Sequence, residues 1–230
     1  VAGKLFCDRF PPDKIPALPT CGIFLRREFP LKNNLEFPEG IHPCEDGLFS
    51  HFALALAEKI SFCPEAVYHY RQHEQGNHHQ IRKRTADILP MIPRWLSLIE
   101  EFYEQRHLWK RKAGHLVRFI EHEPFELRLL GMPFSPPEQE ILYSIIRDFL
   151  NAHCTAAECR RASLHLPFRL LLKSSGFSDF GRRLRRAGKN TGIRRKLLHF
   201  CPVPSWRRNG RAQLRQVREQ LEEIRRNITF

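Results

Sequence analysis

Apolar positions recur at helical spacing along most of the chain, and only a few short stretches alternate in the manner of strands. The first helical pattern covers residues 45–59, whose apolar side chains fall on one face of a helix. From residue 86 onward the helical period continues, with apolar stripes within residues 95–103, 116–120 and 141–150. We therefore expect a small helical bundle in the middle of the chain.

Strand-like stretches are confined to the first third of the chain. They cover residues 3–7, 21–25, 60–63 and 66–70, and the last two are close enough in sequence to form a hairpin. Four short strands are too few for a complete doubly wound sheet. The pattern thus predicts an α/β fragment with short strands, followed by a mainly α-helical C-terminal region.

Positive charge is concentrated in the last quarter of the chain. The 230 residues contain 38 Lys and Arg against 25 Asp and Glu, a formal charge of +13. Residues 179–230 hold 15 of the basic and 4 of the acidic residues, whereas the preceding part is nearly neutral. Residues 174–192 are rich in Ser, Gly, Arg and Lys, which predicts a linker or a surface arm.

The cysteine content and the first residues bear on the compartment of the protein. Seven cysteines without a Cys-x-x-Cys pair fit neither a disulfide scaffold nor a zinc ribbon, which favours a reducing cytoplasm. The chain begins at Val1 without a secretory signal pattern, and we expect further sequence to precede it. No apolar run approaches the roughly 18 residues that a membrane-spanning helix needs.

The first candidate site is a loop that leads into the helix expected over residues 45–59. The loop is Phe37-Pro38-Glu39-Gly40, and Glu45 and Asp46 then stand in the first turn of the helix. Unpaired N–H groups and the positive end of the helix dipole keep a carboxylate ionised there, so it can act as a general base. Acidic residues are also common near helix starts as caps, and capping alone is the competing interpretation.

The second candidate site is a strand end that runs into a basic loop over residues 68–77. Strand alternation puts His69, Arg71 and His73 on one face and the two tyrosines on the other. Arginine and histidine side by side suit a phosphate or a diphosphate. A solvated strand end with both tyrosines in the core is the alternative that the composition leaves open.

Together, these stretches resemble the C-terminal part of the catalytic domain of family 2 glycosyltransferases, which have the GT-A fold. Members of that family show a Phe-Pro-x-Gly loop, then Glu-Asp at the start of a hydrophobic helix, then a Tyr-x-Tyr-Arg or Tyr-Arg-Gln-His segment. The resemblance covers roughly residues 20–80. The matching residues are Phe37-Pro38-Glu39-Gly40, Glu45-Asp46 and Tyr68-x-Tyr70-Arg71-Gln72-His73, with Asn77 soon after.

The resemblance implies an enzyme that moves a sugar from a nucleotide-sugar donor to a saccharide or lipid-linked acceptor, with inversion, in cell-surface polysaccharide synthesis. It implies that Asp46 is the general base that deprotonates the acceptor and that Glu45 orients the acceptor or Asp46. By the same resemblance, Arg71 and His73 would lie near the diphosphate of the donor.

The resemblance also implies a fold and a division into domains. Residues 1–85 would be an incomplete GT-A (Rossmann-like) acceptor half, residues 86–176 a helical extension, and residues 177–230 a basic amphipathic tail. The donor-binding sheet of the family and its Asp-x-Asp motif have no match here, so we expect these 230 residues alone to be inactive.

A divalent metal ion, Mg or Mn, is implied by the resemblance, with ligands mostly outside this chain. The only acidic pairs with the spacing of an Asp-x-Asp motif are Glu121/Glu123 and Glu138/Glu140. Both pairs occur in the helical region. We expect them to be solvated charges at helix ends rather than metal ligands.

The basic tail predicts a polyanionic partner. Cations and apolar residues are interleaved over residues 182–206, which suits peripheral contact with anionic lipid on the inner face of a membrane. Nucleic acid is the alternative, in which case the chain is a cytosolic nucleic-acid-binding or scaffold protein. A charge run that only aids solubility is a third interpretation. Heptad-spaced apolar residues predict self-association through residues 214–228.

Overall fold

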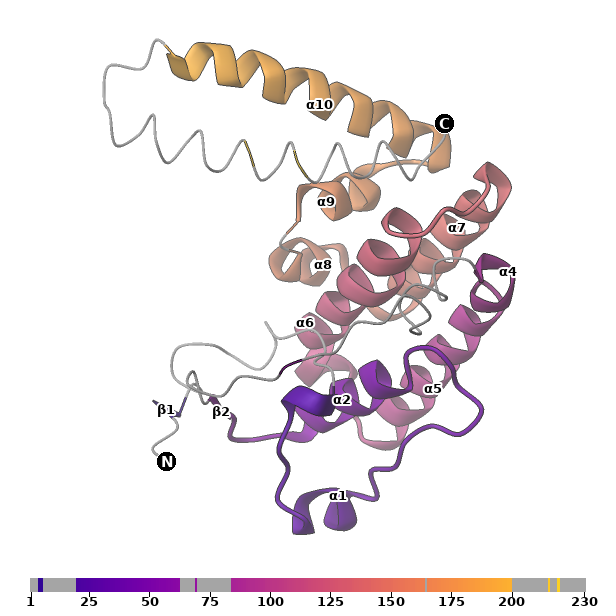
Figure 1. Cartoon of the computed structure of the whole chain (residues 1–230), viewed down its shortest axis with the longest axis vertical. Coiled ribbons are helices and arrows are strands. Elements are labelled where there is room, and N and C mark those ends of the chain that lie inside the picture. Colours follow the sequence, from indigo (N-terminus) through magenta and orange to yellow (C-terminus); the bar gives the residue numbers. More distant parts are fainter. Residues whose placement is uncertain are drawn as a thin grey trace.

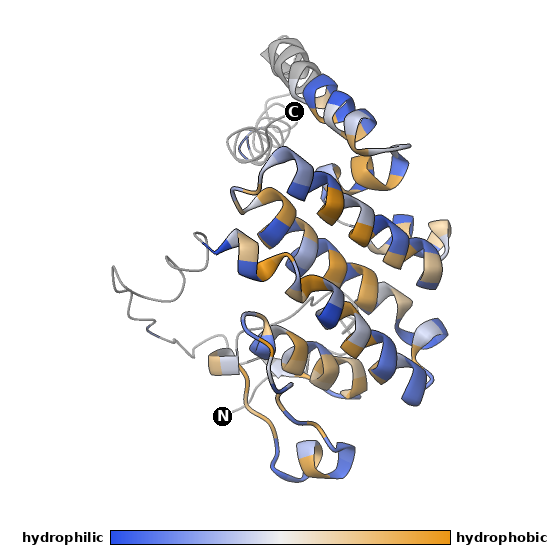
Figure 2. Ribbon diagram, turned by 90° about the vertical axis from the view of Figure 1, so that its right-hand side faces the viewer, coloured by the Kyte–Doolittle hydropathy of each residue, from blue (hydrophilic) through white to orange (hydrophobic). Residues whose placement is uncertain are grey.

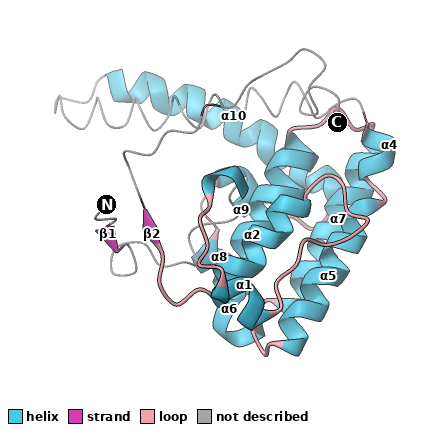
Figure 3. Cartoon of the chain, turned by 60° about the horizontal axis from the view of Figure 1, so that its bottom comes forward, coloured by secondary structure: helices cyan, strands magenta, loops and turns pink. Residues whose placement is uncertain are grey.

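The structure is a computed structural model that describes residues 4–5, 20–62, 69, 84–163, 165–199, 215 and 219. Helices dominate this part of the chain, and its sheet consists of two strands of two residues each (Figure 1, Figure 3). The expectation of an incomplete GT-A (Rossmann-like) α/β unit is therefore wrong. None of the described helices combines the length and the apolar character needed to cross a membrane.

The described elements fall into an N-terminal group and a helical group. The first group comprises β1 (Lys4–Leu5), the 3₁₀ helix η2 (Thr20–Gly22), α1 (Glu28–Asn33), α2 (Glu45–Leu56) and β2 (Ser61–Phe62). The second group comprises α4 (Thr85–Ile88), α5 (Met91–Gln105), α6 (Trp109–Ile120), the π-helix η3 (Glu121–Leu130), α7 (Pro136–His153), α8 (Ala156–Ala162), α9 (Leu166–Lys173) and α10 (Phe177–His199).

The expected strands account for little of the observed structure. Residues 21–25 form the end of η2 and irregular chain, and the side chain of Phe24 is 95% exposed. A strand is stabilised by its cross-strand pairs, and no described strand lies beside this segment. β1 and β2 pair antiparallel with each other, and residues 66–70 lie outside the described residues apart from His69.

The expected helix over residues 45–59 is confirmed as α2, which ends at Leu56. It is more deeply buried than one apolar face requires, because every residue from Gly47 to Ala55 is buried. α2 packs on α5 and α6, which cover it within one hydrophobic core (Figure 1). Figure 2 shows the apolar positions of the helices gathered between them and the polar positions outside.

The expected helical bundle is also confirmed. On α5 the side chains of Ile92, Trp95, Ile99 and Tyr103 are fully buried, at the spacing of one helix face. Directly after α6 the backbone widens into the π-helix η3, which contains Pro124. Proline cannot donate to the i−4 carbonyl and its ring clashes with it, which disfavours an ordinary α-helix at this point.

Local sequence signals set the start of two helices. Ser135 and Glu138 form a capping box at the start of α7, and Thr155 and Glu158 form one at the start of α8. In each box the glutamate accepts from both the hydroxyl and the backbone N–H of the capping residue. These contacts lower the pKa of both glutamates, first through the hydroxyl and then through the backbone N–H.

The linker or surface arm expected over residues 174–192 comprises the short connection after α9, residues 174–176, and the first part of the long helix α10. Phe180 and Leu184 are buried against the bundle, so one face of the segment packs on other helices. The high content of glycine and charged residues did not indicate this face. In Figure 1, α10 crosses α9 and continues away from the bundle. The seam expected over residues 214–228 lies outside the described residues except for Arg215 and Glu219.

Candidate functional site

Glu45 and Asp46 lie in the first turn of α2, at the surface of the protein. Both residues are partly exposed, whereas the helix behind them is buried. Asp46 Oδ1 accepts a hydrogen bond from the Gly47 backbone N–H at 2.8 Å, which satisfies one of the free N–H groups of this helix end. Asp46 therefore supports its own helix terminus and still reaches the surface.

Glu45 is held by a neighbouring side chain of the preceding loop. Its Oε1 lies 3.3 Å from His42 Nδ1, and both side chains are substantially exposed. The residue before the helix, Cys44, adopts a left-handed backbone conformation and contributes no side-chain cap. The two carboxylates are thus the polar groups that this turn presents to solvent.

The Phe-Pro-x-Gly loop lies against two helices, α2 and α5. The ring of Phe37 is half exposed and stacks on Phe49 of α2, with 4.2 Å between ring centroids. Gly40 has a φ of +67°, which favours glycine, and a Cβ there would lie 3.8 Å from Arg94 Nη2 of α5. The loop therefore has a defined path into the helix that carries Asp46.

Beneath the first turn of α2 lies a buried carboxylate from the π-helix. Glu123 Oε2 accepts from Arg128 Nη2 at 3.1 Å, and the Arg128 guanidinium lies over the ring of Trp95 at 5.4 Å. A Cβ on Gly47 would meet Cys44 Sγ at 2.9 Å and Glu123 Oε1 at 3.3 Å. Glycine at this position therefore avoids crowding against Cys44 and the Glu123 carboxylate.

Cys44 takes part in this buried contact as a neutral thiol. Burial raises the pKa of the Cys44 thiol well above its ordinary value, and the charge of Glu123 and a hydrogen bond with that carboxylate raise it further. A thiolate is the reactive form of cysteine, so this thiol is suited to packing rather than to nucleophilic chemistry.

The expectation that Glu121 and Glu123 are solvated is wrong, because both are buried in η3. Each is paired with an arginine: Glu121 with Arg118 and Glu123 with Arg128. Glu121 also accepts from the His165 backbone N–H at 2.7 Å. A buried carboxylate needs such partners, and the sequence spacing by itself does not reveal them.

A polar cluster that the sequence did not predict lies deeper along α2. His51 and His115 are fully buried and their rings stack with centroids 4.2 Å apart. Tyr103 Oη lies 3.1 Å from His51 Nε2, and His115 Nε2 lies 3.1 Å from the His51 carbonyl oxygen. These contacts tie α2 to α5 and α6, and their burial assigns them to the core rather than to the surface site.

Two of the four predicted site residues, Arg71 and His73, lie outside the described residues. The structure therefore places Glu45 and Asp46 together and does not test their relation to the diphosphate group. Among the described residues, no group of three His, Cys, Asp or Glu side chains could hold a metal ion. The Mg or Mn ion stays an expectation from the resemblance, with ligands mostly outside this chain, and no catalytic step here is assigned to a metal.

Comparisons of the chain with models of protein families, with curated proteins and with solved structures find no match. The resemblance to family 2 glycosyltransferases rests on the sequence motifs alone.

Proposed function

We propose that this chain supplies the acceptor-activating carboxylate of a nucleotide-sugar-dependent glycosyltransferase, and that Asp46 is this carboxylate. One observation carries the proposal: Asp46 stands partly exposed at the N-terminus of a helix that is otherwise buried. None of the ion pairs among the described residues involves Asp46. The Phe37–Gly40 loop and the motif order support the same assignment.

The proposed reaction uses Asp46 as the general base. Asp46 accepts the proton of an acceptor hydroxyl while the hydroxyl oxygen forms a bond to the anomeric carbon of the donor sugar. The bond from that carbon to the nucleoside diphosphate breaks on the opposite face, which inverts the configuration. Glu45, oriented by His42, is placed to bind a second acceptor hydroxyl.

The proposal concerns the acceptor side of the reaction. The described residues contain a sheet of only two short strands, so the proposal does not invoke a nucleotide-binding sheet within them. Arg71 and His73 remain the residues proposed to bind the donor diphosphate, because guanidinium and imidazole groups donate hydrogen bonds to phosphate oxygens.

The decisive experiment replaces the proposed base in the protein translated from its complete reading frame. Sugar transfer is measured from radiolabelled UDP-glucose, UDP-galactose, UDP-N-acetylglucosamine and GDP-mannose to extracted membrane lipids and saccharides. Asp46→Asn should lower turnover at least about 100-fold and leave donor binding nearly unchanged, because only the proton acceptor is lost.

Asp87→Asn provides a matched control. Asp87 also lies in the first turn of a helix, α4, but it is exposed and paired with Arg84 at 2.7 Å. This variant should retain full transfer. A fully active Asp46→Asn enzyme would remove Asp46 from its role, and absence of transfer from every donor would overturn the proposed function.

A further inference from the structure

The outward face of α10 carries a row of arginines that is separate from the site at α2. Arg182, Arg183, Arg185 and Arg186 are all exposed. The opposite face packs on the bundle, where Phe180 is 0% and Leu184 is 4% exposed. Because the apolar side of these turns is already used for packing, the side that remains for a partner is cationic.

The charge on this helix is far from balanced. α10 contains eight basic residues and one acidic residue, Asp179. Asp179 Oδ2 accepts from Arg183 Nε at 2.7 Å and Oδ1 accepts from Arg182 Nη2 at 3.3 Å. One carboxylate thus serves two guanidinium groups, and the helix keeps a net charge of +7 from these counts.

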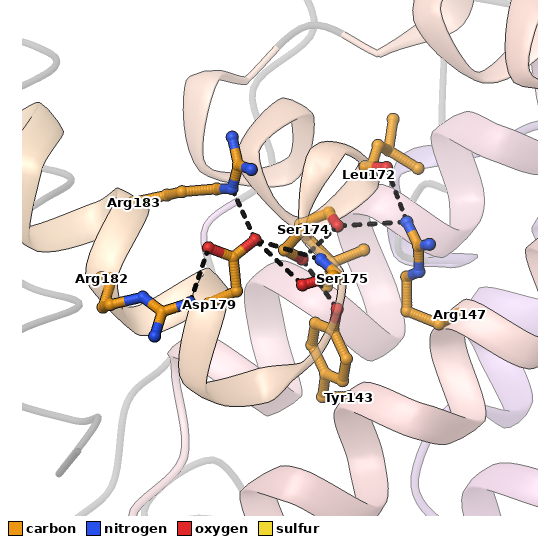
Figure 4. Close-up of polar contacts among 9 residues, drawn as sticks. Tyr143, Arg147, Leu172, Ser174, Ser175, Asp179, Arg182 and Arg183 are labelled. Carbon is orange, nitrogen blue, oxygen red and sulfur yellow. Dashed lines mark hydrogen bonds and ion pairs between the residues drawn. The ribbon is translucent and has the colours of Figure 1, made fainter.

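The start of α10 is fastened to the rest of the bundle by hydrogen bonds (Figure 4). The Tyr143 hydroxyl of α7 lies 2.7 Å from Ser174 Oγ, and Arg147 Nη1 donates to the Leu172 carbonyl oxygen at 2.6 Å. The Ser175 backbone N–H donates to Asp179 Oδ2 at 3.1 Å. The arginine face is therefore held in one orientation relative to α7 and α9.

We propose that the outward face of α10 is an electrostatic docking surface for the phosphate headgroups of an anionic membrane. Guanidinium groups bind phosphate oxygens in pairs and remain charged at any physiological pH. Residues 177–188 of α10 present no large exposed apolar side chain for insertion into lipid, so we expect binding there to depend on charge and to be sensitive to salt. This differs from the sequence expectation of interleaved apolar and basic contacts over residues 182–206.

Two features of the helix favour a lipid surface over nucleic acid. Both phenylalanines of the described turns, Phe177 and Phe180, pack against the core, so these turns lack the exposed rings on which single-stranded bases stack. Residues 177–188 contain no Asn or Gln, so they lack the amide side chains that read adenine edges beside arginine. A cationic face on one side of a nearly neutral bundle suits a planar array of phosphates.

The proposal is tested by co-sedimentation of the full chain with phosphatidylcholine vesicles that contain about one third phosphatidylserine or none. Binding is expected with phosphatidylserine only, and it should weaken between about 50 and 200 mM salt. The double variant Arg185→Glu/Arg186→Glu should lower the partition coefficient at least about tenfold. The Arg160→Glu/Arg161→Glu variant makes the same charge change at exposed positions of α8 and should bind as the unmodified chain does.

Circular dichroism checks that each variant is folded, and Arg185→Gln/Arg186→Gln replaces the double reversal if that variant unfolds. Equal losses in the α8 and α10 variants would overturn the proposal, since net charge alone would then explain binding. So would absence of vesicle binding by the unmodified chain. Salt-sensitive binding to a duplex of arbitrary sequence without vesicle binding would assign the face to nucleic acid instead.

Discussion

The arginines of the π-helix region and those of α10 lie in opposite surroundings although their chemistry is the same. Arg118 and Arg128 are buried, and each is matched by one glutamate of η3. On α10 the arginines are exposed, and a single aspartate contacts two of them. Burial enforces pairing because an isolated charge away from water is very costly, whereas exposed charges need no partner.

This difference indicates separate roles for the two regions. In the π-helix the charges are committed to one another and to the backbone, so they specify how η3 packs beneath α2. On α10 the side chains of Arg182, Arg183, Arg185 and Arg186 lie at the surface.

Removal of one buried charge should have the largest effect. Glu121→Gln leaves the Arg118 guanidinium buried without its counter-charge and weakens the bond to the His165 N–H. The free energy of unfolding, measured by urea denaturation, should fall by about 3–5 kcal/mol. Glu140→Gln at an exposed position of α7 is the control and should change it by less than about 0.5 kcal/mol. Similar small losses in both variants would contradict the structural role of the buried pair.

A methyl group added at a helical glycine should have opposite effects on stability at two sites: where α2 contacts η3, and in α10. Gly47→Ala brings a Cβ to 2.9 Å from Cys44 Sγ, so it should destabilise the fold by about 1–3 kcal/mol. Gly188→Ala in α10 meets no atom within 4 Å and should stabilise it by up to about 1 kcal/mol through helix propensity. Thermal unfolding of both variants measures the two signs, and a shared sign would refute the contrast.

The smallest effect is a pH dependence at the start of α10. Hydrogen bonds from Arg183 and then from the Ser175 N–H lower the pKa of Asp179 from its ordinary value of 3.8 to about 2. The stabilisation is complete above the ordinary value and is lost as pH falls through the lowered one. The melting temperature should therefore decrease between about pH 4 and pH 2 more steeply in the unmodified chain than in Asp179→Asn. Parallel curves would show that these contacts add nothing.

Several parts of the fold could be read from local sequence patterns. The apolar periodicity located α2 and the bundle helices, and the Ser-x-x-Glu and Thr-x-x-Glu patterns mark the observed starts of α7 and α8. These features depend on neighbours three or four residues away, which the sequence contains in full. The sequence pattern likewise predicts Glu45 and Asp46 on the first turn of a helix, which the structure confirms, and their catalytic roles stay predictions.

Other features depended on residues distant in the chain. The strand expected over residues 21–25 found no described partner strand, and the charged, glycine-containing segment after residue 174 became a helix because α7 and α9 bury Phe180 and Leu184. Glu123 is buried where Arg128 pairs with it and the first turn of α2, at Gly47, packs against it. No periodicity within a segment contains this information.

Local sequence patterns were sufficient to locate α2 and the helices of the central bundle, and to show that positive charge gathers near the C-terminal end. Tertiary structure alone decided which of the charged groups lie inside and which face water. The physical reason is that helix formation depends on contacts within about one turn, whereas the cost of burying a charge depends on every element that packs around it.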